Sequence, residues 1–148
     1  MSAGAETLVV RAEITEMARV ANWSDAFAAR MHMPQSILFA IQLCLEEAVS
    51  NVVRYGFADG PGGTGVNQDV TLTLERQGGA VILTVNDFGL AFDPLETAIP
   101  VKSSTIEEAA IGGNGILLMR QFAQHLHYER RDGMNRLTLR FDLPEAAE

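Results

Sequence analysis

Two pairs of alternating segments, each joined by a tight glycine turn, constrain the fold more than any other feature of the sequence. "DVTLTLER" (69–76) and "AVILTVND" (80–87) alternate apolar and polar residues and flank Gly78 and Gly79. A short glycine turn between two such segments is typical of a β-hairpin. "HYERRDGMNRLTLRFDL" (127–143) predicts a second hairpin, with an Asp-Gly turn between its strands. Each hairpin has one apolar face, which the rest of the chain must cover.

Three segments with helical spacing can provide this cover. A strand rich in β-branched residues, "TLVVRAEI" (7–14), precedes the first helix, for which Thr15 is the predicted N-cap. The second helix is predicted to start at Pro34 and to run to about Gly56, since proline suits a first helical turn and glycine a helix end. "GGNGILLMRQFAQHL" (112–126) starts with glycines and continues with helical spacing, so it predicts the third helix.

This order of elements predicts an α/β two-layer sandwich. Helices with a single apolar stripe must share one core, so we expect a mixed, mostly antiparallel sheet of about five strands with three helices on one face. A chain of 148 residues is most simply one domain, here 1–148. The segment from Phe88 to Ile111 has no sustained period, and so long a connection is expected to be a functional lid or disordered.

Charge and cysteine content indicate the class of partner and the compartment. The chain has 19 acidic and 11 basic residues and a formal charge of -8, which repels phosphate backbones and argues against direct nucleic-acid binding. The single cysteine, Cys44, lies between leucines and is expected to be a buried, reduced thiol. The most apolar stretch, 37–45, is too short to span a bilayer. We therefore expect a cytoplasmic protein that does not contact the membrane.

The second helix carries an acid and an amide on the same face. A buried stripe is predicted from the three-and-four spacing of Ile37, Ile41, Cys44, Ala48 and Val52. Glu47 and Asn51 fall on a neighbouring row, four residues apart. Such a pair is commonly a solvated rim with a weak interaction. With a phosphate ligand nearby, however, the carboxylate could take a proton from a hydroxyl, and the amide oxygen could bind a hard cation such as Mg²⁺.

Two further segments could provide a nucleotide site. Asp87 and Gly89 follow the end of an apolar strand, where a carboxylate can accept from the exocyclic amine of adenine and a glycine lets a flat base approach the backbone. An ordinary turn has the same composition. "GGNG" (112–115) begins the third helix, where free backbone N–H groups can bind phosphate, although a hinge would explain the glycines as well. The chain has neither a dinucleotide fingerprint nor a Gly-Lys-Ser/Thr phosphate loop.

Together and in this order, these segments resemble the GHKL (histidine-kinase-like) ATPase superfamily, and most closely its bacterial anti-sigma-factor serine/threonine kinases. "EEAVSNVVRYGF" (46–57) resembles the N-box of these proteins, "DFGLAFDP" (87–94) the first glycine box and "GGNGILLMR" (112–120) the second. The resemblance covers nearly the whole chain and implies a Bergerat-type ATP-binding fold. It also implies ATP and Mg²⁺ as cofactors.

The resemblance assigns expected roles to the residues of these boxes. By this carry-over, Glu47 is the catalytic general base and Asn51 is the ligand of the Mg²⁺ that accompanies the nucleotide. Asp87 reads adenine, and Gly89 belongs to the first glycine box. The chemistry implied is transfer of a phosphoryl group to a serine or threonine hydroxyl, in which positioning and charge neutralisation do most of the work.

The phosphate-binding part of the site is expected in the second glycine box and the lid. Gly113 and Gly115 match the phosphate-cradling glycines, and Asn114 stands between them where a leucine or a basic residue is frequent in the family. Lys102, the single lysine of the chain, is the candidate lid contact to phosphate. Tyr55 also departs from the family, since many relatives have histidine there.

The implied protein partners are an anti-sigma-factor antagonist as substrate and a sigma factor, or another sequestered protein, as second ligand, with a homodimer as the assembly. No phosphoacceptor histidine segment precedes the first strand, so a complete sensor histidine kinase is not expected. Two other functions are compatible with the same residues. One is a nucleotide-gated binding module without turnover, which would have no need of Glu47, and the other is a simple ATP hydrolase.

Overall fold

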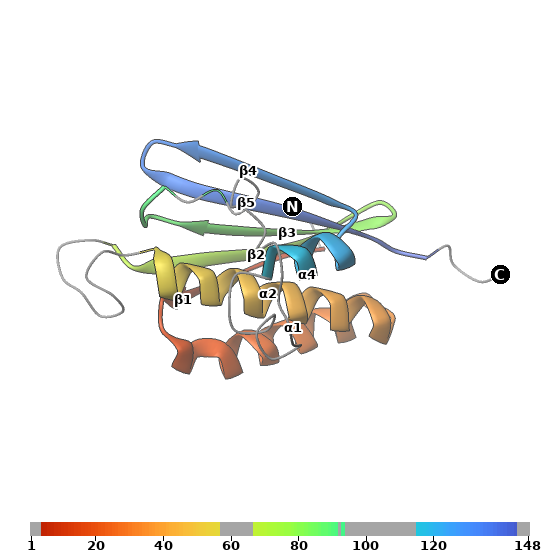
Figure 1. Cartoon of the computed structure of the whole chain (residues 1–148). Coiled ribbons are helices and arrows are strands. Elements are labelled where there is room, and N and C mark those ends of the chain that lie inside the picture. The colour runs from red at the N-terminus through yellow and green to blue at the C-terminus, as the bar shows by residue number, and fades with distance from the viewer. Residues whose placement is uncertain (1–3, 57–66, 92, 94–114, 145–148) are drawn as a thin grey trace, which may run out of the picture.

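The structure is a computed structural model, which describes residues 4–56, 67–91, 93 and 115–144. Its elements follow the predicted order of strand, two helices, hairpin, helix and hairpin (Figure 1). They are β1 (Ala5–Arg11), a 3-10 turn (Ile14–Glu16), α1 (Met17–Met31), α2 (Gln35–Tyr55), β2 (Asp69–Gln77), β3 (Ala80–Asp87), α4 (Gly115–Phe122), β4 (His125–Arg131) and β5 (Met134–Asp142).

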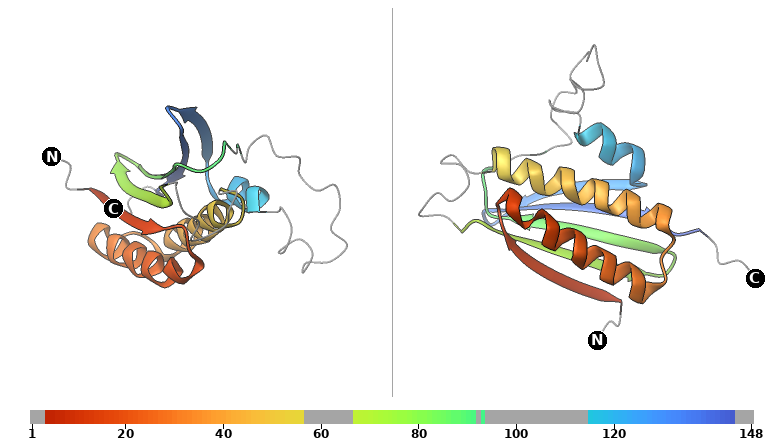
Figure 2. Two further views of the ribbon diagram at one scale, coloured as in Figure 1. Left: turned by 90° about the vertical axis from the view of Figure 1, so that its left-hand side faces the viewer. Right: turned by 90° about the horizontal axis from the view of Figure 1, so that it is seen from below.

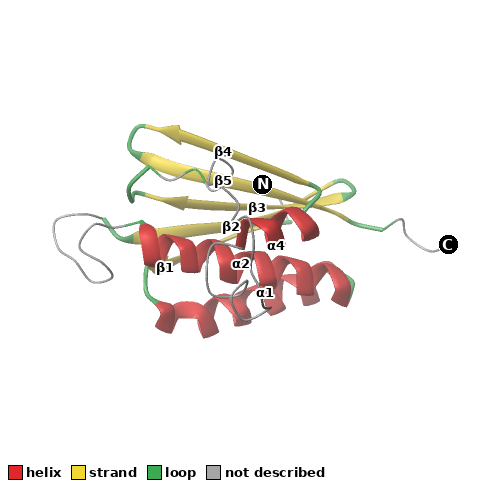
Figure 3. Ribbon diagram, in the orientation of Figure 1, coloured by secondary structure: helices red, strands yellow, loops and turns green. Residues whose placement is uncertain are grey.

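The strands form one five-stranded sheet in the order β1-β2-β3-β5-β4, and every neighbouring pair is antiparallel. Figure 1 and the two views of Figure 2 show α1, α2 and α4 on the same face of this sheet. Colouring by secondary structure separates the two layers, helices on one side and strands on the other (Figure 3). The predicted two-layer sandwich is confirmed, with a sheet that is antiparallel throughout the described residues.

Both predicted hairpin turns are present. Gln77 pairs with Ala80 across the first turn, and Gly78 has a φ of 58°. In the second turn Asp132 and Gly133 have φ values of 53° and 78°. Positive φ at both central residues is the geometry that Asp-Gly favours, because its twist matches that of the flanking strands. These turns set the register within each hairpin, and the pairing of β3 with β5 joins the two hairpins at the site described below.

The core lies between the sheet and α2. Leu83 and Leu139 on the sheet are fully buried, as are Ile41 and Cys44 on α2. Burial is the main reason that the pKa of the Cys44 thiol is raised to about 12, with a further contribution from the negative charge of Glu47. The prediction of a buried, reduced thiol is confirmed, since Cys44 is free and enclosed.

Two predicted helix boundaries are wrong. Thr15 does not cap α1, because it lies inside the short 3-10 turn that precedes the helix. The residue at the N-cap position is Glu16, whose carboxylate instead accepts from the Arg11 backbone N–H at 3.0 Å and ties the helix start to β1. The third helix ends at Phe122 and not at Leu126. Leu126 pairs with Leu139 in the sheet, so strand pairing overrides the helical spacing of this segment.

α2 is long and apolar enough to cross a membrane by length and composition alone over Gln35–Arg54. Half of that stretch is buried inside the molecule, and Ile41 and Leu45 of the helix belong to the core. The apolar character of α2 is therefore that of a core helix.

Candidate functional site

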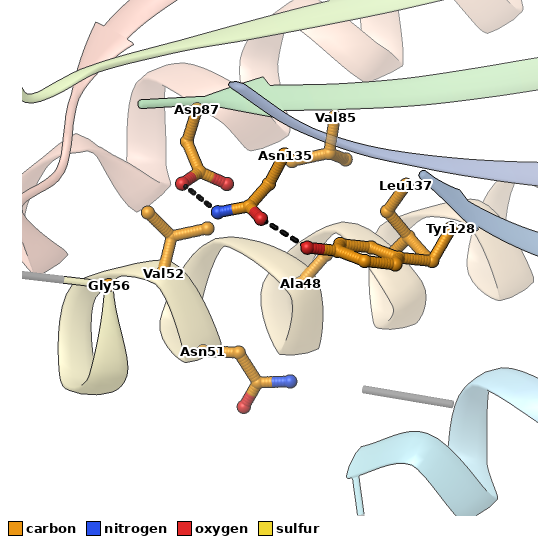
Figure 4. Close-up of a pocket in the computed structure, with 9 residues that line it drawn as sticks. All are labelled: Ala48, Asn51, Val52, Gly56, Val85, Asp87, Tyr128, Asn135 and Leu137. Atoms are coloured by element: carbon orange, nitrogen blue, oxygen red, sulfur yellow. Dashed lines mark hydrogen bonds between the residues drawn. The ribbon is translucent and has the colours of Figure 1, made fainter. Parts of the chain in front are cut away.

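A cavity lies where the C-terminal half of α2 faces the ends of β3, β4 and β5 (Figure 4). It is lined by Ala48, Asn51, Val52, Gly56, Val85, Asp87, Tyr128, Asn135 and Leu137. Aliphatic side chains from both layers form its walls, and a hydrogen-bonded group of polar side chains lies on the sheet side. This combination of apolar walls and a few fixed polar groups is typical of a small-molecule site.

Asp87, the last residue of β3, is the acidic side chain of this group and is only 5% exposed. Its Oδ1 atom accepts from the Gly89 backbone N–H at 2.9 Å and from Nδ2 of Asn135 at 3.0 Å. Among the described residues no hydrogen bond reaches Oδ2. Burial raises the pKa of Asp87, while these two hydrogen bonds and the positive charge of Arg130 act in the opposite direction. Asp87 therefore has one oxygen held by the protein and one left for a ligand.

Asn135 and Tyr128 are members of the site that the sequence analysis missed. Asn135 is 6% exposed and lies directly opposite Asp87 in the pairing of β3 with β5. The hydroxyl of Tyr128 donates to Oδ1 of Asn135, and Nδ2 of Asn135 also donates to the Leu90 carbonyl at 2.8 Å. A signal was present in the sequence, because Asn135 is an amide in the apolar phase of an alternating strand.

The segment after β3 is fixed against α2 and β4. The Leu90 N–H donates to the Gly56 carbonyl at the end of α2 at 2.6 Å, and Arg130 donates to the Gly89 carbonyl at 2.7 Å. A Cβ atom on Gly89 would lie 2.3 Å from the Gly56 oxygen. The close approach that requires this glycine is therefore to the protein's own helix end. The expectation that Gly89 also makes room for a base stays a prediction.

We expect Gly89→Ala to lower the free energy of unfolding by about 1–3 kcal/mol, because the new methyl group collides with backbone that cannot rotate away. The matched control is Gly79→Ala, where an added Cβ meets nothing within 4 Å and should leave stability nearly unchanged. Thermal unfolding of both variants measures the difference. Equal melting temperatures for Gly89→Ala and wild type would show that the loop can move away from α2 at little cost.

The two residues singled out on α2 have different positions. Asn51 lines the cavity, and Figure 4 shows its side chain pointing away from Asp87. Glu47, one helical turn earlier, is partly buried and is not among the lining residues. Burial raises the pKa of Glu47, and the neighbouring Glu46 adds to this effect while Arg54 opposes it. Asn51 and Asp87 thus share one cavity, and Glu47 lies beside it along the helix.

The other predicted phosphate contacts belong to the lid and to the second glycine box. Lys102, Gly113 and Asn114 lie outside the residues that the structure describes. Gly115 is the first residue of α4. α4 packs against α2, where the rings of Phe122 and Phe39 meet edge to face with centroids 6.0 Å apart.

Comparison with known proteins agrees with this architecture. Residues 10–141 match the family model described as the histidine kinase-like ATPase domain. The chain is 33% identical over 139 residues to the serine/threonine-protein kinase BtrW of Bordetella bronchiseptica, covering 94% of both proteins. It is 29% identical over 119 residues to the anti-sigma F factor of Geobacillus kaustophilus, covering 80% of this chain and 77% of that protein.

A solved structure with the same fold is that of the RsbU and RsbW domains of Rv1364c from Mycobacterium tuberculosis. It matches with a TM-score of 0.65 at 16% identity, over 96% of this chain and 34% of that one. At this identity the likeness shows the fold alone.

The chain therefore belongs to the histidine kinase-like ATPases, a family of nucleotide-using proteins. Within them it belongs to the group of anti-sigma-factor serine/threonine kinases.

Proposed function

We propose that the protein binds Mg-ATP in the cavity beneath α2 and transfers the terminal phosphoryl group to a serine or threonine of an anti-sigma-factor antagonist. The observation that carries this proposal is the shared cavity of Asp87 and Asn51, one on the sheet and the other on the helix. The two residues offer different ligand chemistry at the two sides of one apolar space.

The cavity has the groups that an adenine base needs. Val52 and Leu137 provide apolar surfaces from opposite layers, between which a flat ring can be excluded from water. Oδ2 of Asp87 can accept a hydrogen bond from an exocyclic amine. A guanine base would place a carbonyl oxygen against this carboxylate, so adenine is the base that fits.

The amide oxygen of Asn51 is a hard donor of the kind that binds Mg²⁺. When bound with the nucleotide, this ion would neutralise charge on the phosphates. Because the Asn51 side chain points away from Asp87, the base and the metal would contact different ends of the site. Gly113, Gly115 and Lys102 are proposed as the further phosphate contacts, with Asn114 between the two glycines.

Glu47 is proposed as the general base. It takes the proton of the acceptor hydroxyl as that oxygen bonds to the terminal phosphorus and the bond to the bridging oxygen of ATP breaks, which releases ADP. Its position one turn from Asn51 is on the same side of the helix as the proposed metal ligand. Burial raises the pKa of Glu47 towards neutral pH, and a general base is more effective when its pKa is nearer to the pH at which the enzyme works.

The proposed partners follow from the family. A sigma factor, or another sequestered protein, would be the second ligand, and the assembly would be a homodimer. The formal charge of -8 favours a basic partner surface. We place this function in the cytoplasm, where ATP and sigma factors meet.

The direct test is to mix the purified protein with Mg-ATP and the antagonist-like proteins of its own genome, and to measure their masses. We expect one of them to gain a single phosphoryl group. ATP consumption without any phosphorylated protein would indicate a simple hydrolase. ATP binding without turnover would indicate a nucleotide-gated binding module.

We also expect Asn51→Ala to weaken ATP binding in the presence of Mg²⁺ by about tenfold, because the cation loses an oriented oxygen ligand. Binding measured in excess chelator should change much less. Calorimetric titrations with and without Mg²⁺ give both values. An equal loss under the two conditions would show that Asn51 supports the cavity and does not hold the metal.

A further inference from the structure

The amide of Asn135 has one orientation that satisfies its neighbours. Nδ2 donates to Oδ1 of Asp87 at 3.0 Å and to the Leu90 carbonyl at 2.8 Å, so both amide hydrogens are used. Rotating the amide by half a turn would place its oxygen against these two acceptors. The observed orientation is therefore strongly preferred, and it leaves Asn135 no amide hydrogen to give to a ligand.

Tyr128 reinforces this orientation from the other side. Its hydroxyl donates to Oδ1 of Asn135, and the amide oxygen could not be held in this way if the group were reversed (Figure 4). Tyr128 comes from β4, Asn135 from β5 and Asp87 from β3, so the chain of hydrogen bonds crosses three strands. The three side chains are thus placed by the pairing of the strands, and the backbone of Gly89 and Leu90 adds hydrogen bonds to them.

These contacts fix the orientation of the Asp87 carboxylate. Oδ1 is held by two donors, Asn135 and the Gly89 N–H, and Oδ2 is left for the ligand. Donors on Oδ1 also favour the charged form of the carboxyl over the neutral form. A neutral carboxyl could donate to a 6-oxo group, whereas the charged one can only accept.

We propose that Asn135, oriented by Tyr128, is a positioning residue that aims Asp87 at the base and makes the cavity select a 6-aminopurine over a 6-oxopurine. The proposal rests on the proposed function, in which Asp87 reads the adenine amine. It assigns Asn135 and Tyr128 to base selectivity, through Asp87 and without requiring direct contact with the nucleotide.

The test compares the affinities of Mg-ATP and Mg-inosine triphosphate, which carries a 6-oxo group, for wild type and variants. We expect wild type to prefer ATP by about ten- to a hundredfold. In Asn135→Ala the preference should fall about tenfold, because Oδ1 of Asp87 loses one of its two donors. In Tyr128→Phe it should fall about two- to tenfold, since the ring remains and the hydrogen bond to Asn135 is lost.

The matched control is Asn86→Ala. Asn86 is the neighbour of Asp87 in β3, and its side chain accepts from Arg136 at 3.0 Å on the other face of the sheet. Its loss should leave the preference for ATP unchanged. If Asn135 served stability alone, its loss would lower the affinities for both nucleotides equally. The ratio of the two affinities therefore separates the two explanations.

The pH dependence gives an independent readout. Around Asp87, the charged or titratable groups among the described residues are Arg130 on β4 and Tyr128, while α2 contributes the neutral Asn51 to the cavity. Asn135 lowers the pKa of Asp87, so its removal should raise that pKa. As the pH is lowered, ATP affinity should therefore begin to fall at a higher pH in Asn135→Ala than in wild type.

The outcomes distinguish the two layers of the proposal. If wild type binds ATP and inosine triphosphate equally well, the assignment of Asp87 as the adenine contact fails. If wild type prefers ATP, and both Tyr128→Phe and Asn135→Ala keep the same preference as wild type, the positioning role is overturned. Should Asn135→Ala not fold, Tyr128→Phe decides, because it keeps the ring that lines the cavity.

Discussion

Replacing Glu47 with glutamine should slow phosphotransfer by about 10²–10⁴-fold and leave ATP affinity close to that of wild type. Glutamine keeps the shape and hydrogen-bonding capacity of the side chain but cannot take a proton at neutral pH. Glu47 is not among the residues that line the cavity, so its substitution should leave the proposed contacts to adenine unaffected. Rates of acceptor phosphorylation and calorimetric affinities, measured side by side, provide the test.

The adjacent residue offers a matched control for this substitution. Glu46 is exposed, so Glu46→Gln makes the same change of charge one residue away. It should retain nearly the full rate. A Glu47→Gln protein as fast as Glu46→Gln would rule out the general-base role.

The pH dependence of the rate should report the same carboxylate. A base acts when ionised, so the rate should rise as pH rises through the pKa of Glu47. Because burial raises this pKa, the acid limb should lie above that of an ordinary glutamate. Glu46 raises the pKa further through its negative charge, and Glu46→Gln should therefore move the limb to lower pH.

The fold could be predicted because local signals and long-range structure agree. The Gly78 and Asp132-Gly133 turns set two hairpins with one apolar face each, and three amphipathic segments had one way to cover them. The two wrong helix boundaries lie where tertiary contacts compete with local preference. Leu126, for example, has helical spacing but is paired with Leu139 in the sheet.

The site was predicted less completely, because part of it depends on register between strands. Asn51 and Asp87 lie in segments that carry a family pattern, and the structure brings them to one cavity. Asn135 lies opposite Asp87 only because β5 pairs with β3 in the observed register, which no local pattern specifies. The same limit applies to Gly89, whose requirement comes from the Gly56 carbonyl, more than thirty positions away by residue number.

Asp87→Asn should weaken ATP binding while keeping the hydrogen bonds that Asp87 makes within the protein. The Oδ1 atom of an asparagine can accept the same two internal hydrogen bonds, from the Gly89 N–H and from Asn135. The pocket-facing atom then changes from an acceptor to a donor, which opposes the adenine amine. A lost hydrogen bond to a charged group is worth about 1.5–3 kcal/mol, so ATP affinity should fall about ten- to a hundredfold.

The stability of the nucleotide-free protein should not fall in Asp87→Asn, although its ATP affinity does. Burial raises the pKa of Asp87 despite its hydrogen bonds, so the folded protein favours the neutral carboxyl more than the unfolded chain does. The charged form consequently lowers stability at neutral pH, and that contribution disappears as pH falls through the raised pKa. A neutral asparagine removes it at every pH, and the melting temperature of Asp87→Asn at pH 7 should equal or exceed that of wild type.

Calorimetry and thermal unfolding of Asp87→Asn together test both statements, with Asp142→Asn as the matched control. Asp142 also ends a strand but lies on the surface in an ion pair with Arg140, so its substitution should change neither ATP affinity nor the melting temperature appreciably. Unchanged ATP binding by a folded Asp87→Asn protein would exclude Asp87 as the adenine contact. A large loss of stability would instead show that the charged hydrogen bonds of Asp87 outweigh the cost of burying its carboxylate.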